Sequence, residues 1–213
     1  MVYVYIANVQ NLPDPKEYPA IMQGLPEERK QKIMRFKYSE DRRQSLGAGL
    51  LLGKVLKSHG ISMNDIKIGN GGKPEVEGVC FNLSHSGEYA VCAVSESCVG
   101  CDVEKIANAP LRMAEKYFGE NEIRHLAEIS EEKRNEEFYR IWTMKESYLK
   151  MTGEGLRIPL DKFEIEFGDE IRIHREGEIC TCHVKEYMIP GYKLTVCAEE
   201  AEFAEDVEYQ TIA

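Results

Sequence analysis

Two short segments hold the residues of this chain that are best suited to chemistry. Trp142, Glu146 and Lys150 recur every four residues in a helical pattern, so their side chains share one helix face, one turn apart. Earlier in the chain, the two-residue period of a strand places Asp102 and Glu104 on one face. Three carboxylates and a lysine that converge would suit Mg²⁺, which prefers oxygen ligands and leaves positions for water and substrate phosphates.

Each of these features also has a simpler interpretation. An isolated D-x-E pair such as Asp102 and Glu104 is more often the solvent face of an edge strand. Glu146 and Lys150 could form an ordinary ion pair along the helix, which would contribute only a few tenths of a kcal/mol. The metal site is favoured because the other face of the Glu146 helix is apolar and should be core, which turns Glu146 toward a cleft.

Three further segments could supply contacts to a phosphate. Ser84 and His85 follow one another in a strand, so they point to opposite faces and cannot form a hydrolase dyad. They suit a strand end where a phosphate binds, although a single histidine is commonly bonded to backbone. Lys73 and Pro74 lie in a glycine-rich turn that either presents the lysine or is only a turn. The basic island of residues 29–43 is, as a charge run alone, best interpreted as a solvated helix face.

Composition narrows the class of protein. The chain has 213 residues, of which 43% are hydrophobic and 30% charged, as in ordinary globular proteins. Its net charge of −10 argues against nucleic acid or an anionic membrane as a partner. No apolar run approaches the roughly 18 residues of a membrane span, and the first residues lack the features of a signal peptide. We therefore expect a cytoplasmic protein.

The seven cysteines agree with a reducing compartment, because the number is odd and no export signal accompanies it. Cys98 and Cys101, together with Cys180 and Cys182, could in principle form a four-thiolate zinc site. Both pairs fall in strand-like stretches rather than in turn-rich knuckles. We favour buried small hydrophobic side chains over zinc, since free cysteines are commonly buried.

The order of elements suggests an internal duplication. Strands are predicted at 2–9, 79–84, 89–95, around Asp102, and at 162–167, 170–174, 179–188 and 192–198. Helices are predicted at 26–36, 39–58, 110–118, 120–128 and 131–151, with Ser39 as a cap and Gly60 and Gly153 as stops. Strand, helices and strands thus occur twice, and residues 56–60 resemble 149–153. The predicted fold is α+β, with two similar α/β subdomains (1–100 and 101–213) in a pseudo-twofold arrangement and the active site in the cleft between them.

Four motifs together resemble those of the 4′-phosphopantetheinyl transferases, in particular the large surfactin-type group. They are G-x-D-x-E at 100–104, W-x-x-K-E-x-x-x-K at 142–150, F-N-x-S-H-S-G at 81–87 and Gly72-Lys73-Pro74. Each motif alone is weak, but the ordered set and its spacing are highly specific and extend over most of the chain. The duplicated pattern fits the monomeric members of the family rather than the small trimeric ones.

The resemblance implies a reaction and its participants. The phosphopantetheine arm of coenzyme A would pass to a serine of an apo acyl or peptidyl carrier protein, releasing adenosine 3′,5′-bisphosphate. By the same resemblance, Asp102, Glu104 and Glu146 would hold Mg²⁺ on the pyrophosphate. Glu146 would also accept the proton of the carrier serine, and Lys150 would stabilise or protonate the leaving phosphate.

The resemblance also assigns the nucleotide end of coenzyme A. Lys73, Pro74, Ser84 and His85 would contact it, with His85 at the 3′-phosphate. Basic side chains would reach the phosphates, drawn from Arg29, Lys32 and one of the pair Arg42 and Arg43. Family members carry an arginine just after a Glu-Asp pair, whereas this chain has two arginines and then Gln44, so the choice between the pair stays open.

Two other functions remain as alternatives. One is another Mg²⁺-dependent phosphoryl or nucleotidyl transferase, although the chain has no Walker loop and no kinase motif set. The other is a non-catalytic protein that binds coenzyme A or a carrier. The carrier could serve fatty-acid, polyketide or nonribosomal-peptide synthesis. Residues 111–118 are either a surface for that carrier or the core of a short amphipathic helix.

Overall fold

The computed structural model describes residues 1–69 and 72–212. The helices are α1 (Glu27–Arg35), α2 (Ser39–Ser58), α3 (Ala114–Tyr117), α4 (Glu120–Glu128) and α5 (Glu131–Thr152). The strands are β1 (Tyr3–Asn8), β2 (Lys67–Ile68), β3 (Pro74–Glu75), β4 (Cys80–Ser86), β5 (Tyr89–Ser95), β6 (Val99–Lys105), β7 (Phe163–Glu166), β8 (Arg172–Arg175), β9 (Glu178–Ile179), β10 (His183–Ile189), β11 (Tyr192–Ala198) and β12 (Glu208–Tyr209). Part of the glycine-rich turn predicted before Lys73 lies outside the described residues.

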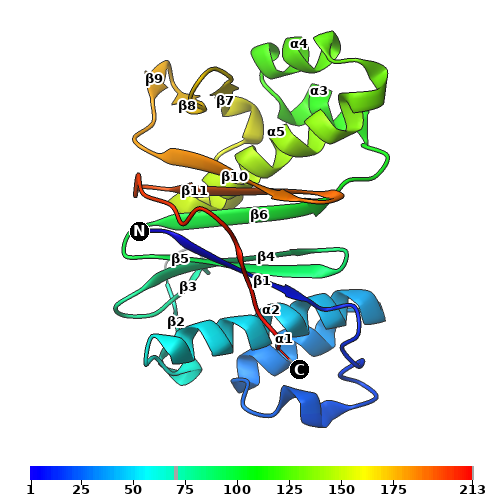
Figure 1. Cartoon of the computed structure of the whole chain (residues 1–213), viewed down its shortest axis with the longest axis vertical. Coiled ribbons are helices and arrows are strands. Elements are labelled where there is room, and N and C mark those ends of the chain that lie inside the picture. The colour runs from blue at the N-terminus through cyan, green and yellow to red at the C-terminus, as the bar shows by residue number, and fades with distance from the viewer. Residues whose placement is uncertain (70–71, 213) are drawn as a thin grey trace.

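The same strand–helix–hairpin unit occurs twice, as Figure 1 shows. In the first repeat β1 pairs antiparallel with β5, and β5 with β4; in the second, β6 pairs antiparallel with β11, and β11 with β10. The long helices α2 and α5 occupy equivalent places between the first strand and the hairpin of each repeat. The prediction of two similar α/β subdomains is therefore confirmed. The expected boundary between residues 100 and 101 falls inside β6 and stays a prediction.

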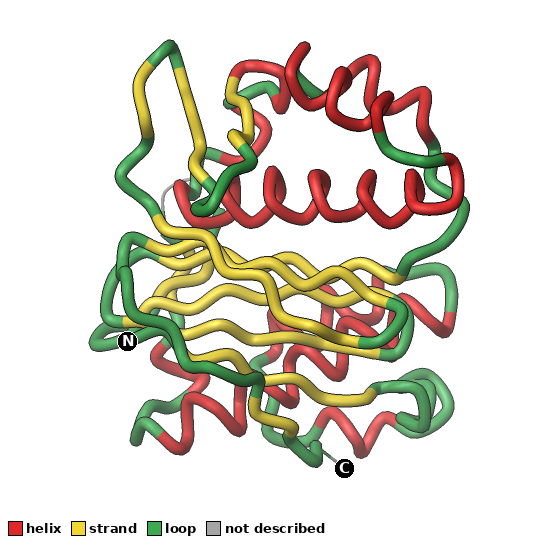
Figure 2. The backbone as a smooth tube through the Cα atoms, turned by 45° about the horizontal axis from the view of Figure 1, so that its top comes forward, coloured by secondary structure: helices red, strands yellow, loops and turns green. Residues whose placement is uncertain are grey.

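The repeats form layers, with helices outside and the two sheets inside (Figures 1 and 2). One apolar core lies between α2 and the first sheet and includes Leu46 and Cys92. A second joins the two sheets and includes Val4 and Val103. A third packs α5 against the second sheet and the β7–β8 hairpin. The alternation of burial along β5, with Ala90, Cys92 and Val94 in one core and Val91 and Ala93 in the other, is what a strand buried on both faces requires.

Both long helices end as the sequence predicts, but one begins differently. Gly153 follows α5 in the left-handed conformation at φ 71°, and its N–H donates to the Leu149 carbonyl. Ser39, predicted to cap α2, is instead its first helical residue. Tyr38 takes the N-cap position, and its side chain makes no capping hydrogen bond. A one-residue shift of this kind is common at helix ends.

A glycine lets α2 pack closely against the segment that follows β1. A Cβ at Gly47 would lie 2.2 Å from a methyl carbon of Val9. The apolar stripe of α2 is buried except for Leu50, which is partly exposed. Within the described residues, no helix is both long enough and apolar enough to cross a membrane.

Candidate active site

Asp102 and Lys150 form the centre of the site, where β6 meets the last turn of α5. Asp102 is buried, and the Lys150 Nζ lies 2.6 Å from its Oδ1. Ser84 of β4 donates its hydroxyl to the same oxygen at 2.8 Å, and the Lys150 ammonium also donates to the Ser84 hydroxyl and to the Cys101 carbonyl. Lys150 therefore pairs with Asp102 of its own repeat, reaches Ser84 of the other repeat, and does not form the simple helical ion pair with Glu146.

Close packing of α5 on β6 brings these groups together. A Cβ at Gly100 would lie 2.1 Å from the Ser147 carbonyl oxygen and 2.3 Å from the Met151 nitrogen. Any larger residue would therefore push α5 away from β6, and Lys150 with it. The glycine of the G-x-D-x-E motif is thus explained by a backbone contact that only glycine permits.

Glu104 and Glu146 complete a cluster of three carboxylates. Burial, and then the negative charge of Asp102, raises the pKa of Glu104 to about 7. The same two causes raise the pKa of Glu146, although Lys150 opposes them. Burial disfavours the charged form of Lys150, but the charges of Asp102 and Glu146 outweigh it and raise the pKa of the ammonium. These directions are those expected of carboxylates that lie close enough to repel one another.

The donor set fits a hard cation. Asp102 Oδ2 is buried and has no hydrogen-bond partner in the structure, while Oδ1 is engaged by Lys150 and Ser84. Oxygen ligands with uncompensated negative charge are what Mg²⁺ takes from proteins. Among the described residues, no group of three or more His, Cys, Asp or Glu side chains is arranged so that it could hold a metal ion as the side chains now lie. The three carboxylates are therefore a candidate donor set and not a preformed metal site.

A group of cations lies on the other side of β4. Burial, and then the positive charges of Arg29, Lys150 and Lys32, lowers the pKa of His85. The Nδ1 of His85 and the Nε of Arg29 are buried without a hydrogen-bond partner, although the Arg29 guanidinium does donate to the Ser45 carbonyl at 2.8 Å. Burial also lowers the pKa of Arg29 and of Lys32. Basic side chains that repel one another and keep hydrogen-bonding groups without a partner are suited to bind an anion.

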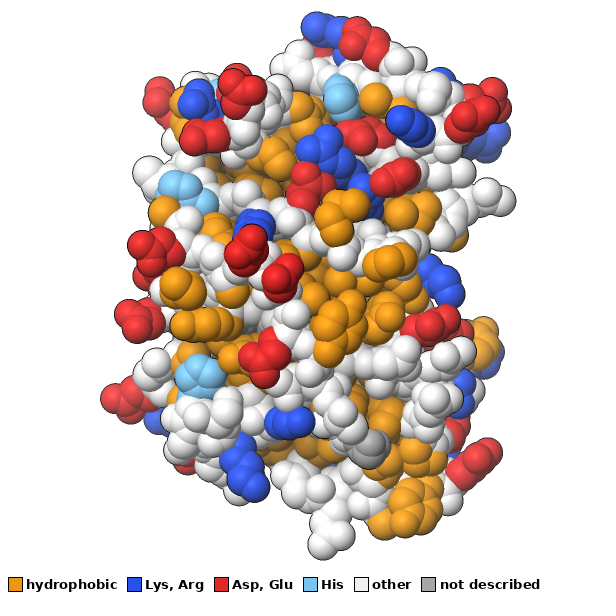
Figure 3. Space-filling view, in the orientation of Figure 1, with side chains coloured by type: hydrophobic (Ala, Val, Ile, Leu, Met, Phe, Trp, Pro, Cys, Tyr) orange, Lys and Arg blue, Asp and Glu red, His pale blue; other side chains and the backbone are white. Residues whose placement is uncertain are grey.

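This basic group is local. The face shown in Figure 3 carries acidic and basic side chains interspersed, with apolar side chains between them. With a net charge of −10, the overall field of the chain does not favour an anion, so any anion bound here would be held by these few placed donors.

The two adjacent arginines are placed differently from that group. Arg42 is buried, and its guanidinium forms an ion pair with Asp14 and donates to the carbonyls of Phe36 and Lys37. It ties the N-terminal loop to the start of α2 and is engaged there, which leaves Arg43 as the more available member of the pair. Arg43 lines a separate cavity of about 190 Å³ with Gln44 and others, so it is the member of the pair that is open to solvent.

Lys73 takes part in a contact that the sequence did not predict. Its Nζ donates to the Lys150 carbonyl at 2.8 Å and lies 3.4 Å from the carbonyls of Val99 and Met151. It therefore satisfies carbonyls at the end of α5, beside the catalytic candidates. Pro74, next in sequence, begins β3 and is partly buried.

Residues 111–118 divide between core and surface. Ala114 and Phe118 are buried in a core formed with α4 and α5, and Phe118 stacks on Phe138. Leu111 and Arg112 are exposed. Neither interpretation of this segment holds for all of it.

Two of the cysteines considered for a zinc site contact other groups through their thiols. The Cys101 thiol donates to the Asn82 carbonyl, and burial raises its pKa to about 12, the opposite of what a thiolate ligand requires. Cys180 lies 3.3 Å from the Tyr148 hydroxyl. Cys98, which we expected to be buried, is exposed.

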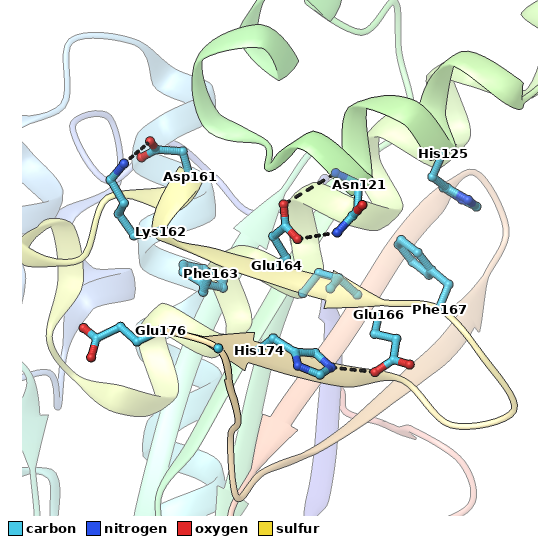
Figure 4. Close-up of a pocket in the computed structure, with 12 residues that line it drawn as sticks. Asn121, His125, Asp161, Lys162, Phe163, Glu164, Glu166, Phe167, His174 and Glu176 are labelled. Atoms are coloured by element: carbon cyan, nitrogen blue, oxygen red, sulfur yellow. Dashed lines mark hydrogen bonds and ion pairs between the residues drawn. The ribbon is translucent and has the colours of Figure 1, made fainter.

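A cavity of about 940 Å³ lies apart from the carboxylate cluster, between α4 and the β7–β8 hairpin (Figure 4). Its polar side chains largely pair with one another: Asn121 donates to Glu164, and His174 pairs with Glu166. The cavity has none of the three carboxylates and none of the cations described above, so we do not assign the chemistry to it.

Comparison with known proteins places the chain in a family. Residues 98–197 match the 4′-phosphopantetheinyl transferase superfamily, and residues 11–97 match the 4′-phosphopantetheinyl transferase N-terminal domain. The 4′-phosphopantetheinyl transferase Sfp of Bacillus subtilis (strain 168) is 31% identical over 207 residues, covering 90% of each chain. The 4′-phosphopantetheinyl transferase gsp of Aneurinibacillus migulanus is 31% identical over 205 residues, covering 93% of this chain and 86% of that one. The chain belongs to the 4′-phosphopantetheinyl transferase family.

Proposed function

We propose that this protein transfers the 4′-phosphopantetheine arm of coenzyme A to a serine of an apo acyl or peptidyl carrier protein. The observation that carries the proposal is the Asp102–Lys150–Ser84 cluster, with two further carboxylates beside it and a basic group across β4, in which Arg29 and His85 are half-buried and Lys32 is exposed. Coenzyme A could bind here with its pyrophosphate at the carboxylates and Lys150, and with its 3′-phosphate at the basic group. Membership of the family supports the same reaction.

In this proposal Asp102, Glu104 and Glu146 hold Mg²⁺. When bound, the ion would neutralise the pyrophosphate and act as a Lewis acid on it. Glu146, one helical turn from Lys150, would take the proton of the carrier serine, directly or through a water molecule. The serine oxygen then bonds to the phosphorus that carries pantetheine, while the bond from this phosphorus to the bridging oxygen breaks.

Lys150 acts on the leaving group. The charge that develops on the departing phosphate of adenosine 3′,5′-bisphosphate needs a cation or a proton. The raised pKa of Lys150 keeps its side chain an ammonium, and its other hydrogen bonds hold it over the cluster. Because the chain supplies positioning and charge, no covalent intermediate on the protein is required.

The nucleotide end of coenzyme A would lie against β4 and α1. His85 would contact the 3′-phosphate, with Arg29 and Lys32 adding charge and hydrogen bonds. Lys73, Pro74 and Ser84 would border the nucleotide, and Arg43 replaces Arg42 as the candidate from the arginine pair. The exposed Leu111 and Arg112 are the proposed carrier contact. We propose a monomer, because the duplication places two repeats in one chain.

Intact-mass spectrometry tests the reaction. Several apo carrier proteins, incubated with the protein, coenzyme A and Mg²⁺, should gain the mass of one phosphopantetheine. Carriers from fatty-acid, polyketide and nonribosomal-peptide systems, tested in parallel, would identify the class served. No mass gain with any carrier would contradict the proposal.

Two variants test the assignment of the site. Asp102→Ala and Glu146→Ala should abolish transfer. Without metal, Glu146→Ala should melt at the same temperature as the wild type or higher, because it relieves repulsion from Asp102. Asp102→Ala should melt lower, because Lys150 loses its partner. Near-normal turnover by either variant at saturating Mg²⁺ would show that these carboxylates are not the metal site.

A further inference from the structure

Side chains, and not backbone bonds, join the two repeats where the site lies. Strands β4 and β6 are neighbouring edges of separate sheets, since backbone bonds pair β4 with β5 and β6 with β11. Every second N–H of β6 donates to a side chain of β4: Cys101 N to Asn82 Oδ1 at 3.1 Å, Val103 N to Ser84 Oγ at 3.3 Å and Lys105 N to Ser86 Oγ at 3.1 Å. We call these three side chains the seam.

The seam forms because the side chains on one face of β4 and the N–H groups on one edge of β6 both recur every two residues. Asn82, Ser84 and Ser86 lie two residues apart and share one face of β4, as the three donors share one edge of β6. A side chain interposed between two strands sets them farther apart than the 4.8 Å or so of direct pairing. The repeats are therefore joined through side chains that lie beside the carboxylates of β6.

Ser86 has a second contact that links the seam to the site. A serine hydroxyl has one proton to donate and lone pairs to accept. Because the Ser86 oxygen accepts the Lys105 N–H, its proton is free to point to Glu104, and the Oγ lies 2.8 Å from Glu104 Oε2. Ser84 makes the equivalent pair of contacts with Val103 and Asp102.

Glu104 needs such a contact more than Asp102 does. Asp102 is held by both Ser84 and Lys150, whereas the Ser86 hydroxyl is the one hydrogen-bond donor to the Glu104 carboxylate within the described residues. Glutamate also has one more rotatable bond than aspartate, so its carboxylate has more freedom to lose.

We infer that Ser86 is a positioning residue, which fixes one oxygen of Glu104 and leaves the other without a hydrogen-bond donor among the described residues. The seam as a whole sets the distance between the repeats. This role rests on the proposed function, in which Glu104 is a metal ligand. Groups that orient metal ligands typically change metal affinity or activity by about 10- to 100-fold when they are removed.

Three variants at this position separate the hydroxyl from the volume of the side chain. Ser86→Ala removes the donor, Ser86→Cys keeps a similar shape with a weak donor, and Ser86→Thr keeps the hydroxyl. Mg²⁺ affinity is measured by calorimetry with and without coenzyme A, and transfer is followed as kcat and KM. Ser86→Ala and Ser86→Cys should each weaken Mg²⁺ binding about tenfold or more and lower kcat, whereas Ser86→Thr should restore both.

The matched control is Ser95→Ala. Ser95 is a strand serine too, although more buried than Ser86, and among the described residues its hydroxyl makes one hydrogen bond, accepted from the Ser97 N–H at the end of β5. It should lower the melting temperature slightly and leave Mg²⁺ affinity and transfer unchanged. In a Glu104→Gln background, Ser86→Ala should cause little further loss of Mg²⁺ affinity, because its effect passes through Glu104.

The result that would overturn the inference is wild-type Mg²⁺ affinity and kcat in folded Ser86→Ala or Ser86→Cys. The seam would then be structural only. If Ser86→Ala does not fold, Ser86→Cys and Ser86→Thr give the same comparison. Failure of the wild type to modify any carrier would count against the proposed function, while the Mg²⁺ titrations would still decide the role of Ser86.

Discussion

The buried ion pair of Lys145 and Glu122 allows a sharp prediction about stability. Neither side chain is exposed, and the Lys145 Nζ lies 2.7 Å from both Glu122 oxygens and from the Phe163 carbonyl. The Glu122 carboxylate also accepts the N–H groups of Gly119 and Ile165. One pair thus ties α4 and β7 to α5, at the residue before Glu146. Burial outweighs the charge of Glu122 and lowers the pKa of Lys145.

Lys145→Met should be strongly destabilising. It keeps most of the volume but leaves the Glu122 carboxylate buried without a counter-charge. Breaking a buried pair by removing one partner costs about 3–5 kcal/mol. At about 2–4 °C per kcal/mol for a chain of this size, the melting temperature should fall by roughly 6–20 °C.

Urea unfolding followed by circular dichroism at neutral pH measures the loss. The double variant Lys145→Met/Glu122→Gln should recover part of the stability, because the uncompensated charge is gone. Lys193→Met is the control: Lys193 pairs with Glu136 at 2.7 Å, but Glu136 is half exposed, so the cost should stay within about 1 kcal/mol. A loss below about 1 kcal/mol for Lys145→Met would refute the reasoning.

Three other predictions concern ligand, carrier and fold. His85→Ala should raise the KM for coenzyme A roughly ten- to hundredfold with a smaller change in kcat, since a lost hydrogen bond to a charged group costs about 1.5–3 kcal/mol. That difference should shrink with 3′-dephospho-coenzyme A, and equal sensitivity of wild type and variant to the 3′-phosphate would contradict the assignment. Leu111→Asp should weaken carrier affinity without changing the melting temperature, because Leu111 is exposed; a lower melting temperature would place it in the core instead. Arg42→Ala should cost about 3–5 kcal/mol in urea unfolding while the KM for coenzyme A stays near that of the wild type. Since Arg42 holds the pKa of Asp14 well below its ordinary value of about 4, the pair stabilises at neutral pH and its contribution is lost as pH falls through that lowered pKa. The variant should therefore lose less stability on acidification than the wild type, and parallel acid profiles would refute this.

Much of the fold could be predicted because its elements are encoded locally. The period of apolar residues predicted both long helices and the strand pairs of each repeat, and Gly153 ends α5 as expected. The repetition of one pattern was enough to predict two similar subdomains. Element ends were less certain, as Ser39 shows, because cap geometry depends on a single hydrogen bond.

The sequence by itself determined which side chains share a face. The two-residue period of a strand places Asp102 and Glu104 on one face, and likewise Ser84 and Ser86. The spacing of a helix places Glu146 and Lys150 on one face. These are constraints within one element, and they hold whatever that element packs against. The same two-residue period could have identified Ser86, since it continues the spacing of Asn82 and Ser84.

Only the tertiary structure decided which faces meet. Lys150 pairs with Asp102 and not with Glu146, because Gly100 lets α5 approach β6. Arg42 pairs with Asp14, 28 residues away in the sequence. Although Arg42 belongs to the basic island of residues 29–43, its charge is therefore neutralised by Asp14. Tertiary packing determines the partners of charged and hydrogen-bonding groups. Burial makes an unpaired charge costly, and the nearest opposite charge then comes from a segment that is distant in the sequence.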